Sequence, residues 1–399
     1  MSLPEFKALA GLYTLRYPDE HITIHLDRLE EHHQVTSAEL TITTDLPGVS
    51  PHLHQARLNL ISTRGRKTIT TYLASRLPDL DWDAMLEQAC ILTLRHHREG
   101  EPLIMIGSMP PSEKPRYRVE PILLENQANL IYGAGGIGKS YFAYLLALLV
   151  ESGVVQLGLT PVQGEVLYLD YETCGEEADE KVRAIKAGMN LPTDCDIHYR
   201  FCHQPLVADI AEIQRMVVGI EAGLVIVDSI GVACGGEPES AEIMLAYFRA
   251  LRSLRVTTLS IDHITKQDKS LFGSVYKYNT ARSIYEVKKS QNPGEAELSI
   301  GLYHRKVNTG RLQHPQGFIL KFGNASVSFN RKDIKEIPEL AEGFPLWERI
   351  KDLLFSGAMT QENIAMKLDA KPEVIRVTLY KYKNIFVKLN DKWGVLIND

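Results

Sequence analysis

The amino-acid sequence predicts an α/β protein whose main part is a largely parallel sheet covered by helices. Three observations support this fold class. Short apolar runs alternate with helical patterns between residues 122 and 330, which is typical of a parallel sheet with helices on both faces. A proline-rich stretch at 108–117 precedes this region, and three short helical patterns follow it. We therefore expect a small α+β domain at 1–110, the main α/β domain at 118–332 and a helical domain at 345–399.

Composition restricts the class of protein. A chain of 399 residues with 44% hydrophobic and 24% charged residues is typical of a folded protein of two or three domains. The five cysteines are scattered and no secretory signal begins the chain, so we expect a cytoplasmic protein. The longest apolar run, residues 141–150, is too short to span a bilayer, which predicts no membrane partner. With a net charge of -6, contacts with nucleic acid must come from local basic surfaces.

The first domain shows an α+β pattern. Residues 21–29 and 35–46 alternate apolar with polar side chains and predict a half-buried hairpin. Two helices are predicted over residues 66–77 and 81–99, and Asp81 is the expected N-cap of the second. The role of this domain stays open.

Eight of the thirteen histidines lie in the first domain. His52 and His54 are expected in an irregular stretch, where they could bind a metal. No cysteine or acidic ligand accompanies them at a recognisable spacing, so we interpret them as surface histidines.

Within the main domain, strands are predicted at "QANLIYG", "GEVLYLDYE", "GLVIVDS" and "VTTLSID", with helical patterns between them. Continuous apolar runs of this kind are typical of parallel strands that are buried on both faces. Three further runs, "ARSIYEVKKS", "ELSIGLYHRKV" and "GFILKFG", are predicted to add antiparallel strands.

The segment "LIYGAGGIGKS", residues 130–140, matches the pattern G-x-x-x-x-G-K-[ST] between a predicted strand and a predicted helix. Glycines let the backbone curl, so that N–H groups and the positive end of the helix face a phosphate. Lys139 is expected to reach the β and γ phosphates, and the Ser140 hydroxyl to hold Mg²⁺. The residues assigned to nucleotide binding in this segment are Gly133, Ala134, Gly135, Gly136, Ile137, Gly138, Lys139, Ser140 and Tyr141.

Carboxylates follow two of the apolar strands. "LVIVDS" places Asp228 at a strand tip, where it is expected to bind the nucleotide's Mg²⁺ together with Ser140. "VLYLDYE" places Asp170 at a second tip, with Glu172 just beyond it. Since alternate residues of a strand face opposite ways, we expect Asp170 and Glu172 to share a side. Glu172 is the preferred group to orient the attacking water, and Asp170 is the alternative.

The order of these motifs, followed by "LSIDHITK", resembles the RecA-like P-loop ATPases. The resemblance is closest to the hexameric replicative helicases of the plasmid RepA type and more distant to the DnaB group, and it covers about residues 120–330. It implies a RecA-like core with ATP and Mg²⁺ as cofactors. It also implies Glu172 as the catalytic glutamate and His263 as the sensor of the γ-phosphate.

The same resemblance implies a homo-oligomer, a hexameric ring, with the nucleotide between subunits. A cation from the neighbouring subunit would complete each site, because charge builds on the transferring phosphoryl group. The resemblance favours Arg282, in "GSVYKYNTARS", as this residue, and Lys306, in "YHRKVNTG", as a second cation. Arg305 is the alternative, and which of the three acts in trans stays open.

Two loops of such a ring would face its central channel, at residues 229–240 and 266–277. Lysines and aromatic side chains alternate in and beside the second loop, a composition suited to single-stranded DNA. These residues are Lys266, Lys269, Phe272, Tyr276, Lys277 and Tyr278.

The C-terminal domain shows three helical patterns followed by two strand patterns, which predicts a winged helix-turn-helix. Thr360 is expected to cap the second helix and Pro372 to lie in the first turn of the third. Residues 367–392 hold seven basic and three acidic side chains, a local excess suited to duplex DNA. Docking of another protein is the alternative role of this domain.

The motifs thus predict ATP hydrolysis, and the resemblance implies a DNA-dependent motor, a ring-forming helicase for the replication of a mobile element. One alternative is a regulatory or recombination ATPase of the RecA or KaiC type that unwinds no strand. The other is a DNA-binding regulator with a degenerate ATP site, which is disfavoured because every expected ATPase group is present.

Overall fold

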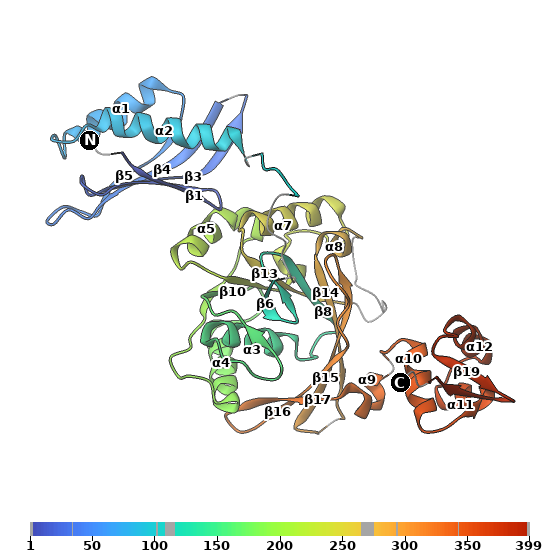
Figure 1. Cartoon of the computed structure of the whole chain (residues 1–399). Coiled ribbons are helices and arrows are strands. Elements are labelled where there is room, and N and C mark those ends of the chain that lie inside the picture. The colour runs from blue at the N-terminus through green and yellow to red at the C-terminus, as the bar shows by residue number, and fades with distance from the viewer. Residues whose placement is uncertain are drawn as a thin grey trace.

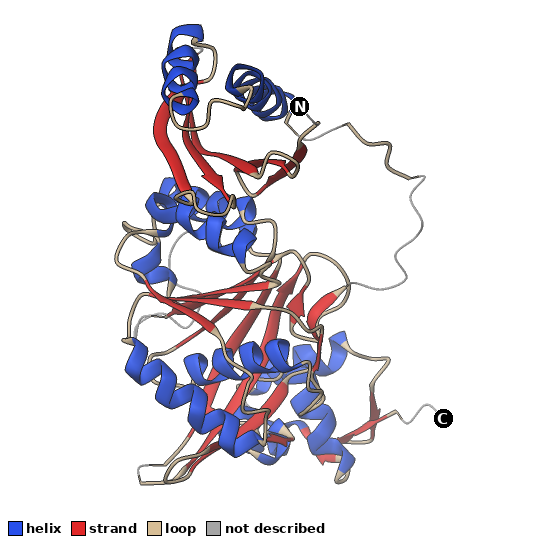
Figure 2. Ribbon diagram, turned by 90° about the vertical axis from the view of Figure 1, so that its left-hand side faces the viewer, coloured by secondary structure: helices blue, strands red, loops and turns tan. Residues whose placement is uncertain are grey.

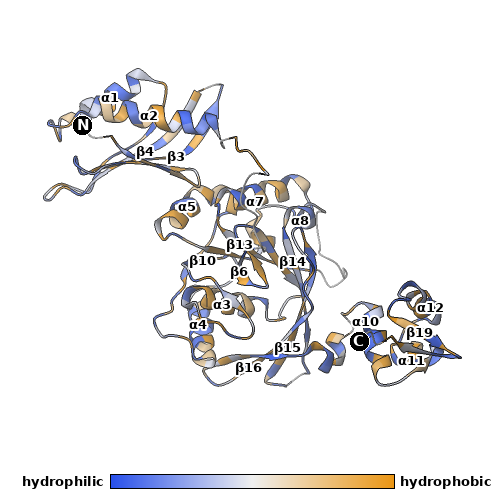
Figure 3. Cartoon of the chain, in the orientation of Figure 1, coloured by the Kyte–Doolittle hydropathy of each residue, from blue (hydrophilic) through white to orange (hydrophobic). Residues whose placement is uncertain are grey.

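The computed structural model describes residues 3–33, 35–100, 103–107, 116–264, 275–292, 294–341 and 343–396. An N-terminal α+β domain, a large central α/β domain and a small C-terminal domain follow one another along the molecule (Figure 1). Buried apolar residues form a core in each domain, and Figure 3 colours the ribbon by the hydropathy of each residue. None of the helices in the described ranges has both the length and the apolar character needed to span a membrane.

The N-terminal domain is an antiparallel sheet with two helices on one face (Figure 1). Its strands pair in chain order: β1 (Glu5–Leu9), β2 (Leu12–Tyr17), β3 (Ile22–His32), β4 (Val35–Thr44) and β5 (His52–Asn59). Every second residue of β4 is buried, and β4 pairs with β3, so the predicted hairpin is confirmed. The two predicted helices are confirmed as α1 (Thr63–Ala74) and α2 (Trp82–Glu99). Asp81 caps α2, since its carboxylate accepts the Ala84 N–H at 3.0 Å.

The expected irregular stretch around His52 and His54 is wrong, because both residues belong to β5, which pairs along its length with β4. The His54 ring packs on Tyr72 of α1, with 5.1 Å between the ring centres. Among the described residues, neither histidine belongs to a group of side chains that could share a metal ion.

The central domain is built on a nine-stranded sheet with the order β11-β10-β12-β13-β8-β14-β15-β16-β17. The strands from β11 to β14 in this order are parallel and the remaining three pair antiparallel, which confirms a mainly parallel sheet. Their bounds are β8 (Ala128–Gly133), β10 (Val166–Asp170), β11 (His198–Phe201), β12 (Leu224–Asp228), β13 (Thr257–His263), β14 (Ser283–Ser290), β15 (Glu297–Val307), β16 (Gln316–Phe322) and β17 (Val327–Lys332).

The predicted direction of one strand in this sheet is wrong. The run "ARSIYEVKKS" forms β14, which is parallel to β8, and only β15, β16 and β17 are antiparallel additions. The connection from β13 to β14 explains the parallel direction. The chain after β13, which includes α8 (Val275–Thr280), returns to the edge where β8 begins, and β14 then starts beside Asn129.

Helices cover both faces of this sheet (Figure 2). Alternate residues of β12 show the consequence: Leu224 and Ile226 belong to the core under α3 and α4, whereas Val225 and Val227 belong to the core under α5 and α7. All four side chains are buried, which explains the unbroken apolar run. The helices are α3 (Lys139–Ser152), α4 (Gly175–Met189), α5 (Leu206–Gly219), α6 (Ile230–Ala233) and α7 (Ala241–Ser253).

Smaller elements complete the central domain. A short sheet is formed by β6 (Tyr117–Glu120), β7 (Leu123–Leu124) and β9 (Thr160–Pro161). After β17, the 3-10 helix η1 (Ile334–Glu336) and α9 (Pro338–Ala341) lead to the C-terminal domain. Their apolar residues Ile334 and Leu340 pack with Tyr303 of β15, so this segment is attached to the central sheet.

The C-terminal domain combines three helices with a three-stranded sheet of order β18-β20-β19. Its elements are α10 (Leu346–Phe355), β18 (Met359–Thr360), α11 (Gln361–Lys367), α12 (Pro372–Lys381), β19 (Phe386–Leu389) and β20 (Lys392–Val395). The predicted cap is present, since the Thr360 hydroxyl accepts the Asn363 N–H at 3.3 Å, and Pro372 lies in the first turn of α12. The strand β18 was not predicted.

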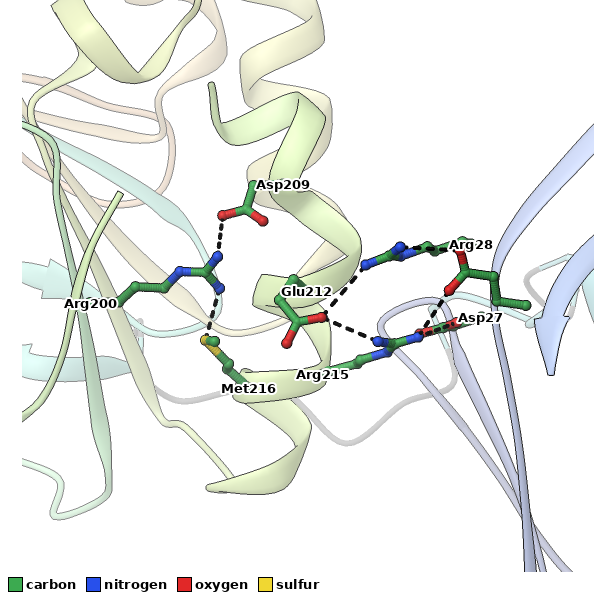
Figure 4. Close-up of polar contacts among 8 residues, drawn as sticks. Asp27, Arg28, Arg200, Asp209, Glu212, Arg215 and Met216 are labelled. Atoms are coloured by element: carbon green, nitrogen blue, oxygen red, sulfur yellow. Dashed lines mark hydrogen bonds and ion pairs between the residues drawn. The ribbon is translucent and has the colours of Figure 1, made fainter. Parts of the chain in front are cut away.

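Charged side chains join the N-terminal domain to α5 of the central domain (Figure 4). Arg215 of α5 donates from Nε and Nη2 to the two carboxylate oxygens of Asp27 on β3, and the Nη2–Oδ1 distance is 2.7 Å. Glu212 of α5 lies 3.7 Å from the Arg28 guanidinium and 3.2 Å from that of Arg215. Since the Asp27 side chain is only 5% exposed, its buried charge depends on Arg215.

Candidate active site

The phosphate-binding loop follows β8 and leads into α3. Gly138, the N-cap of α3, has a φ of 85°, in the left-handed region that favours glycine. At Gly133 a side chain has no room, because a Cβ atom would lie 2.4 Å from the Ile137 side chain and 2.5 Å from the carbonyl oxygen of Val287. Both glycines of the sequence pattern are therefore required by the shape of this loop.

The Lys139 side chain is folded against its own loop and is buried. Its ammonium donates to the carbonyl oxygens of Gly133 at 2.9 Å and Ala134 at 2.7 Å, and it lies 3.3 Å from Nδ1 of His263. Burial lowers the pKa of Lys139 to about 8, and the charges of nearby carboxylates partly offset this effect. A bound phosphate would favour the charged form of this lysine.

Asp228 lies at the tip of β12, beside the first turn of α3. Its side chain is buried, and its Oδ2 accepts a hydrogen bond from the Tyr168 hydroxyl at 2.8 Å. Burial raises the pKa of Asp228, and hydrogen bonds from Ser140 and Tyr168 oppose this rise. The carboxylate and the Ser140 hydroxyl thus lie together, as the sequence predicted for the two Mg²⁺ ligands.

Glu172 and Asp170 have different surroundings. β10 ends at Asp170, whose Oδ1 accepts the N–H groups of Glu172 and Thr173, both at 2.9 Å. Glu172 accepts a hydrogen bond from the Ser229 hydroxyl, and its Oε1 lies 3.2 Å from Nε2 of His263. The strand alternation from which a shared side was predicted ends at Asp170, and the two carboxylates have different hydrogen-bond partners, although the charges of both raise the pKa of Asp228.

His263, the last residue of β13, pairs in register with Gly133 and lies between Lys139 and Glu172. Its contact is the main cause that lowers the pKa of Glu172 to about 2, and the Ser229 hydroxyl and the charges of His263 and Lys139 add to it. Glu172 is therefore ionised at neutral pH, as a group that orients a water molecule must be. His263 thus contacts both the lysine of the loop and the carboxylate beyond β10.

The residues at the strand tips fit a magnesium ion. One ligand atom each of Glu172, Asp228 and His263 lie within 4.8 Å of one another. Carboxylate and hydroxyl oxygens are the ligands that Mg²⁺ prefers, and it is bound through one or two protein groups together with phosphate oxygens. Of these three residues, Asp228 also hydrogen-bonds the Ser140 hydroxyl beside the loop.

Two adjoining cavities lie next to the loop. A cavity of about 320 Å³ is lined by the loop, Glu172 and His263, and a second of about 640 Å³ lies between α4 and the turn after β16. Tyr141, Lys181 and Phe322 line both. The rings of Tyr141 and Phe322 meet edge to face at 5.4 Å, and the Lys181 ammonium lies 5.8 Å from the centre of the Tyr141 ring.

Sequence reasoning missed several residues around these cavities. Lys181 comes from α4, Phe322 from β16 and Gln291 from the residue after β14. Lys289 of β14 donates to a carbonyl oxygen of the loop at 3.2 Å. No local motif marks these residues, because they reach the loop only through the pairing of β14, β15 and β16 and the packing of α4 on α3.

Comparison with known proteins agrees with this geometry. Residues 96–269 match a family described as AAA domain. Loop, sheet and match together support a P-loop ATPase domain. The similar solved structures include a KaiC-like protein from the hyperthermophilic archaeon Pyrococcus horikoshii OT3, which is 16% identical, with a TM-score of 0.40 over 53% of this chain and 93% of that chain. None of the curated proteins matches the chain.

Arg282 lies at the edge of the ATPase sheet opposite to the phosphate-binding loop. Its N–H donates to the carbonyl oxygen of Ala128, the first residue of β8, whereas the loop begins at Gly133, the last residue of that strand. Five residues of extended strand span about 17 Å, so the backbone of Arg282 lies about this far along β8 from the start of the loop. The side chain is exposed, and in the part of the chain that the structure describes it takes part in no hydrogen bond or ion pair.

Arg305 and Lys306 are engaged within the ATPase domain. The Arg305 guanidinium donates to Glu286 from Nε at 2.8 Å and from Nη2 at 2.5 Å. The Lys306 ammonium donates to three carbonyl oxygens at the C-terminal end of α8, among them that of Ala281 at 2.7 Å. Of the three cations considered for a role in trans, these contacts favour Arg282.

The second predicted channel loop is only partly described. Residues 265–274 lie outside the described part of the chain, and with them Lys266, Lys269 and Phe272. Lys277 is 1% exposed, and its ammonium lies 2.9 Å from Oδ2 of Asp262, which is 3% exposed. The expectation that Lys277 offers its charge to a DNA strand is therefore wrong, because this charge balances a buried carboxylate. The first predicted loop contains α6 and ends in the exposed residues Glu237 and Glu239.

Proposed function

We propose that this chain is a magnesium-dependent ATPase that works as a ring and moves along DNA, as a helicase in the replication of a mobile element. The observation that carries the proposal is the placement of Arg282. It is an exposed cation about 17 Å from its own loop, by the rise of a strand, which suits completion of a neighbour's site.

In the proposed reaction, water attacks the γ-phosphorus of ATP. Glu172, ionised at neutral pH, orients that water, and Lys139 holds the β and γ phosphates. His263, between these two side chains, contacts the γ-phosphate and links its presence to β13. Ser140 and Asp228 would hold Mg²⁺, which supplies positive charge at the phosphate oxygens.

We assign the nucleoside to the cavity beyond Tyr141. The phosphate-binding loop lines the smaller cavity, and the larger one adjoins it across Tyr141 and Phe322. Aromatic rings and the ammonium of Lys181 suit the flat base and the sugar of a nucleotide. Preference for ATP over other nucleotides follows from the resemblance to ATPases.

Mixing of two inactive variants tests the ring. Lys139→Ala removes the phosphate lysine, and Arg282→Ala removes the proposed cation in trans. In a mixed ring, a site can combine the intact loop of one protomer with the intact arginine of the next, so random mixing of equal amounts restores about a quarter of the unmodified ATP turnover. Turnover of the mixture equal to the mean of the two separate variants contradicts a role of Arg282 in trans.

The C-terminal domain supports the DNA-directed part of the proposal. We assign it as a winged helix-turn-helix, with α12 as the helix that enters the groove and the hairpin of β19 and β20 as the wing. Basic side chains are exposed on these elements and next to them: Lys367, Lys371, Arg376, Lys381, Lys383, Lys388 and Lys392. An acidic chain would hold duplex phosphate here.

A strand-displacement assay on a forked DNA substrate tests the motor. The unmodified protein is expected to release the displaced strand in the presence of ATP, and Lys139→Ala and Glu172→Gln are expected to release none. ATP turnover that DNA does not stimulate, with no strand released, would contradict the helicase and leave a regulatory ATPase.

A further inference from the structure

A tyrosine in the centre of the sheet contacts the carboxylate proposed to bind magnesium. Tyr168 is the middle residue of β10, is fully buried and pairs in register with Ile226 of β12. Asp228 lies two residues further along β12, on the same face as Ile226, and the Tyr168 hydroxyl donates to its Oδ2 at 2.8 Å. The contact joins residues that are 60 positions apart in the chain.

Neighbouring rings limit the movement of this hydroxyl. The Tyr168 ring stacks on that of Tyr144 in α3, with 4.3 Å between centres and 10° between planes. On the β11 side, the ring of Tyr199 lies 6.4 Å away at 18°. A ring held between α3 and β11 has one orientation, so its hydroxyl occupies a defined place below the tip of β12.

The hydrogen bond determines which oxygen of Asp228 is available. Oδ2 accepts from Tyr168, which holds the plane of the carboxylate and keeps Oδ1 clear of this contact, while Ser140 also hydrogen-bonds the carboxylate. The carboxylate is 5% exposed, so water does not replace a lost donor readily. Groups that orient metal-binding carboxylates commonly change metal affinity by about 10- to 100-fold when they are removed.

We infer that Tyr168 is a positioning residue, which fixes Asp228 for magnesium without touching the ion or the nucleotide. The inference rests on the proposed function, because it assigns Asp228 to the ion. The local sequence does not reveal it, since Tyr168 occupies an apolar strand position like its neighbours Leu167 and Leu169.

Binding of Mn²⁺ to the complex of the full chain with ADP tests the inference. Mn²⁺ takes oxygen ligands as Mg²⁺ does, and its free concentration is measured by electron paramagnetic resonance. Tyr168→Phe removes only the hydroxyl. The matched control is Tyr247→Phe: Tyr247 of α7 is fully buried on the other face of the sheet, and its hydroxyl makes a hydrogen bond of 2.8 Å to Ser260.

Tyr168→Phe is expected to weaken Mn²⁺ binding about 10- to 100-fold, whereas Tyr247→Phe leaves it within about twofold, at similar thermal stability of the two variants. Equal Mn²⁺ affinity in the Tyr168→Phe variant and the unmodified protein overturns the inference, and so does equal weakening in both variants, which indicates a loss of packing only. Failure of the unmodified protein to bind ADP with Mn²⁺ overturns the proposed function instead.

Discussion

The buried ion pair of Lys277 with Asp262 leads to a quantitative prediction. Replacement of Lys277 by methionine keeps most of the side-chain volume and leaves the Asp262 carboxylate buried without that partner. Removal of one partner of a buried pair costs about 3–5 kcal/mol. The two side chains are 1% and 3% exposed, so screening by solvent does not reduce this cost.

Protonation of Asp262 limits the loss of folding stability in the Lys277→Met variant. Burial already raises the pKa of this carboxyl, and Lys277 lowers it again through its charge and hydrogen bond. Without Lys277 the folded-state pKa rises further above the unfolded value of about 3.9, so the folded protein is penalised at high pH and the penalty shrinks as the pH falls. We therefore expect a loss near the lower end, about 3 kcal/mol at pH 7, and a smaller loss at pH 5.

Thermal unfolding of the ATPase domain measures this loss. For a domain of this size, about 3 kcal/mol corresponds to a fall of roughly 6–12 °C in Tm. The matched control is Lys321→Met, because Lys321 forms an ion pair with Glu297 in which the side chains are 53% and 50% exposed. Its loss is expected to stay below about 1 kcal/mol. The double variant with Asp262→Asn is expected to regain part of the loss, since neither of these two positions then carries a buried charge.

A contact of Lys277 with DNA would give a different result. If Lys277 faces a DNA strand, Lys277→Met melts within about 2 °C of the unmodified protein, and the slope of log affinity for DNA against log salt concentration falls by about one. That combination would refute the structural reasoning and restore the role expected from the sequence.

Three further predictions concern the ATPase domain and its contact with the N-terminal domain. Burial lowers the pKa of Lys139 to about 8 and a bound phosphate raises it, so nucleotide binding takes up a proton at pH 8.5 and little at pH 6.5. Calorimetry in two buffers of different ionisation enthalpy measures this uptake. Equal heats of binding in the two buffers at pH 8.5 would speak against it. Glu172→Gln lowers ATP turnover by about 10²- to 10⁴-fold with nucleotide affinity nearly unchanged. Because the pKa of Glu172 is near 2, its protonation does not limit turnover between pH 5 and 8, so an acid limb near pH 5 that disappears in the Gln variant would contradict the assignment. Arg215→Ala removes the ion-pair partner of the nearly buried Asp27, and because Arg215 is itself 31% exposed, we expect docking of the N-terminal domain to weaken by about 2 kcal/mol. Limited proteolysis measures release of that domain. The control is Arg57→Ala, in a more exposed ion pair, which should be cleaved at the same rate as the unmodified protein.

The phosphate-binding loop was predictable because its requirements are local. Gly138 needs a positive φ, and at Gly133 a Cβ atom would meet Ile137 only four residues later, so the residue types themselves indicate the backbone, although Val287 of the distant strand β14 limits the same space. The caps at Asp81 and Thr360 were predictable for the same reason, since each side chain bonds an N–H group three residues later. The mainly parallel sheet followed from the order of apolar and helical patterns.

Side-chain partners across the sheet were not predictable. The runs that form β10, β12 and β13 are buried on both faces, and such runs carry no alternation from which register could be inferred. The direction of β14 depended in the same way on where the chain returns to the sheet.

The sequence by itself determined the phosphate-binding loop, the succession of strands and helices, and the carboxylates at the strand tips, because these depend on backbone conformation and spacing within a few residues. Only the tertiary structure decided that Lys277 is buried, that Arg305 and Lys306 are engaged while Arg282 is exposed, and that Tyr168 reaches Asp228. The physical reason is that a charge or a hydroxyl is available for a ligand only if no buried partner has already taken it, and such partners come from distant strands whose register is set by packing.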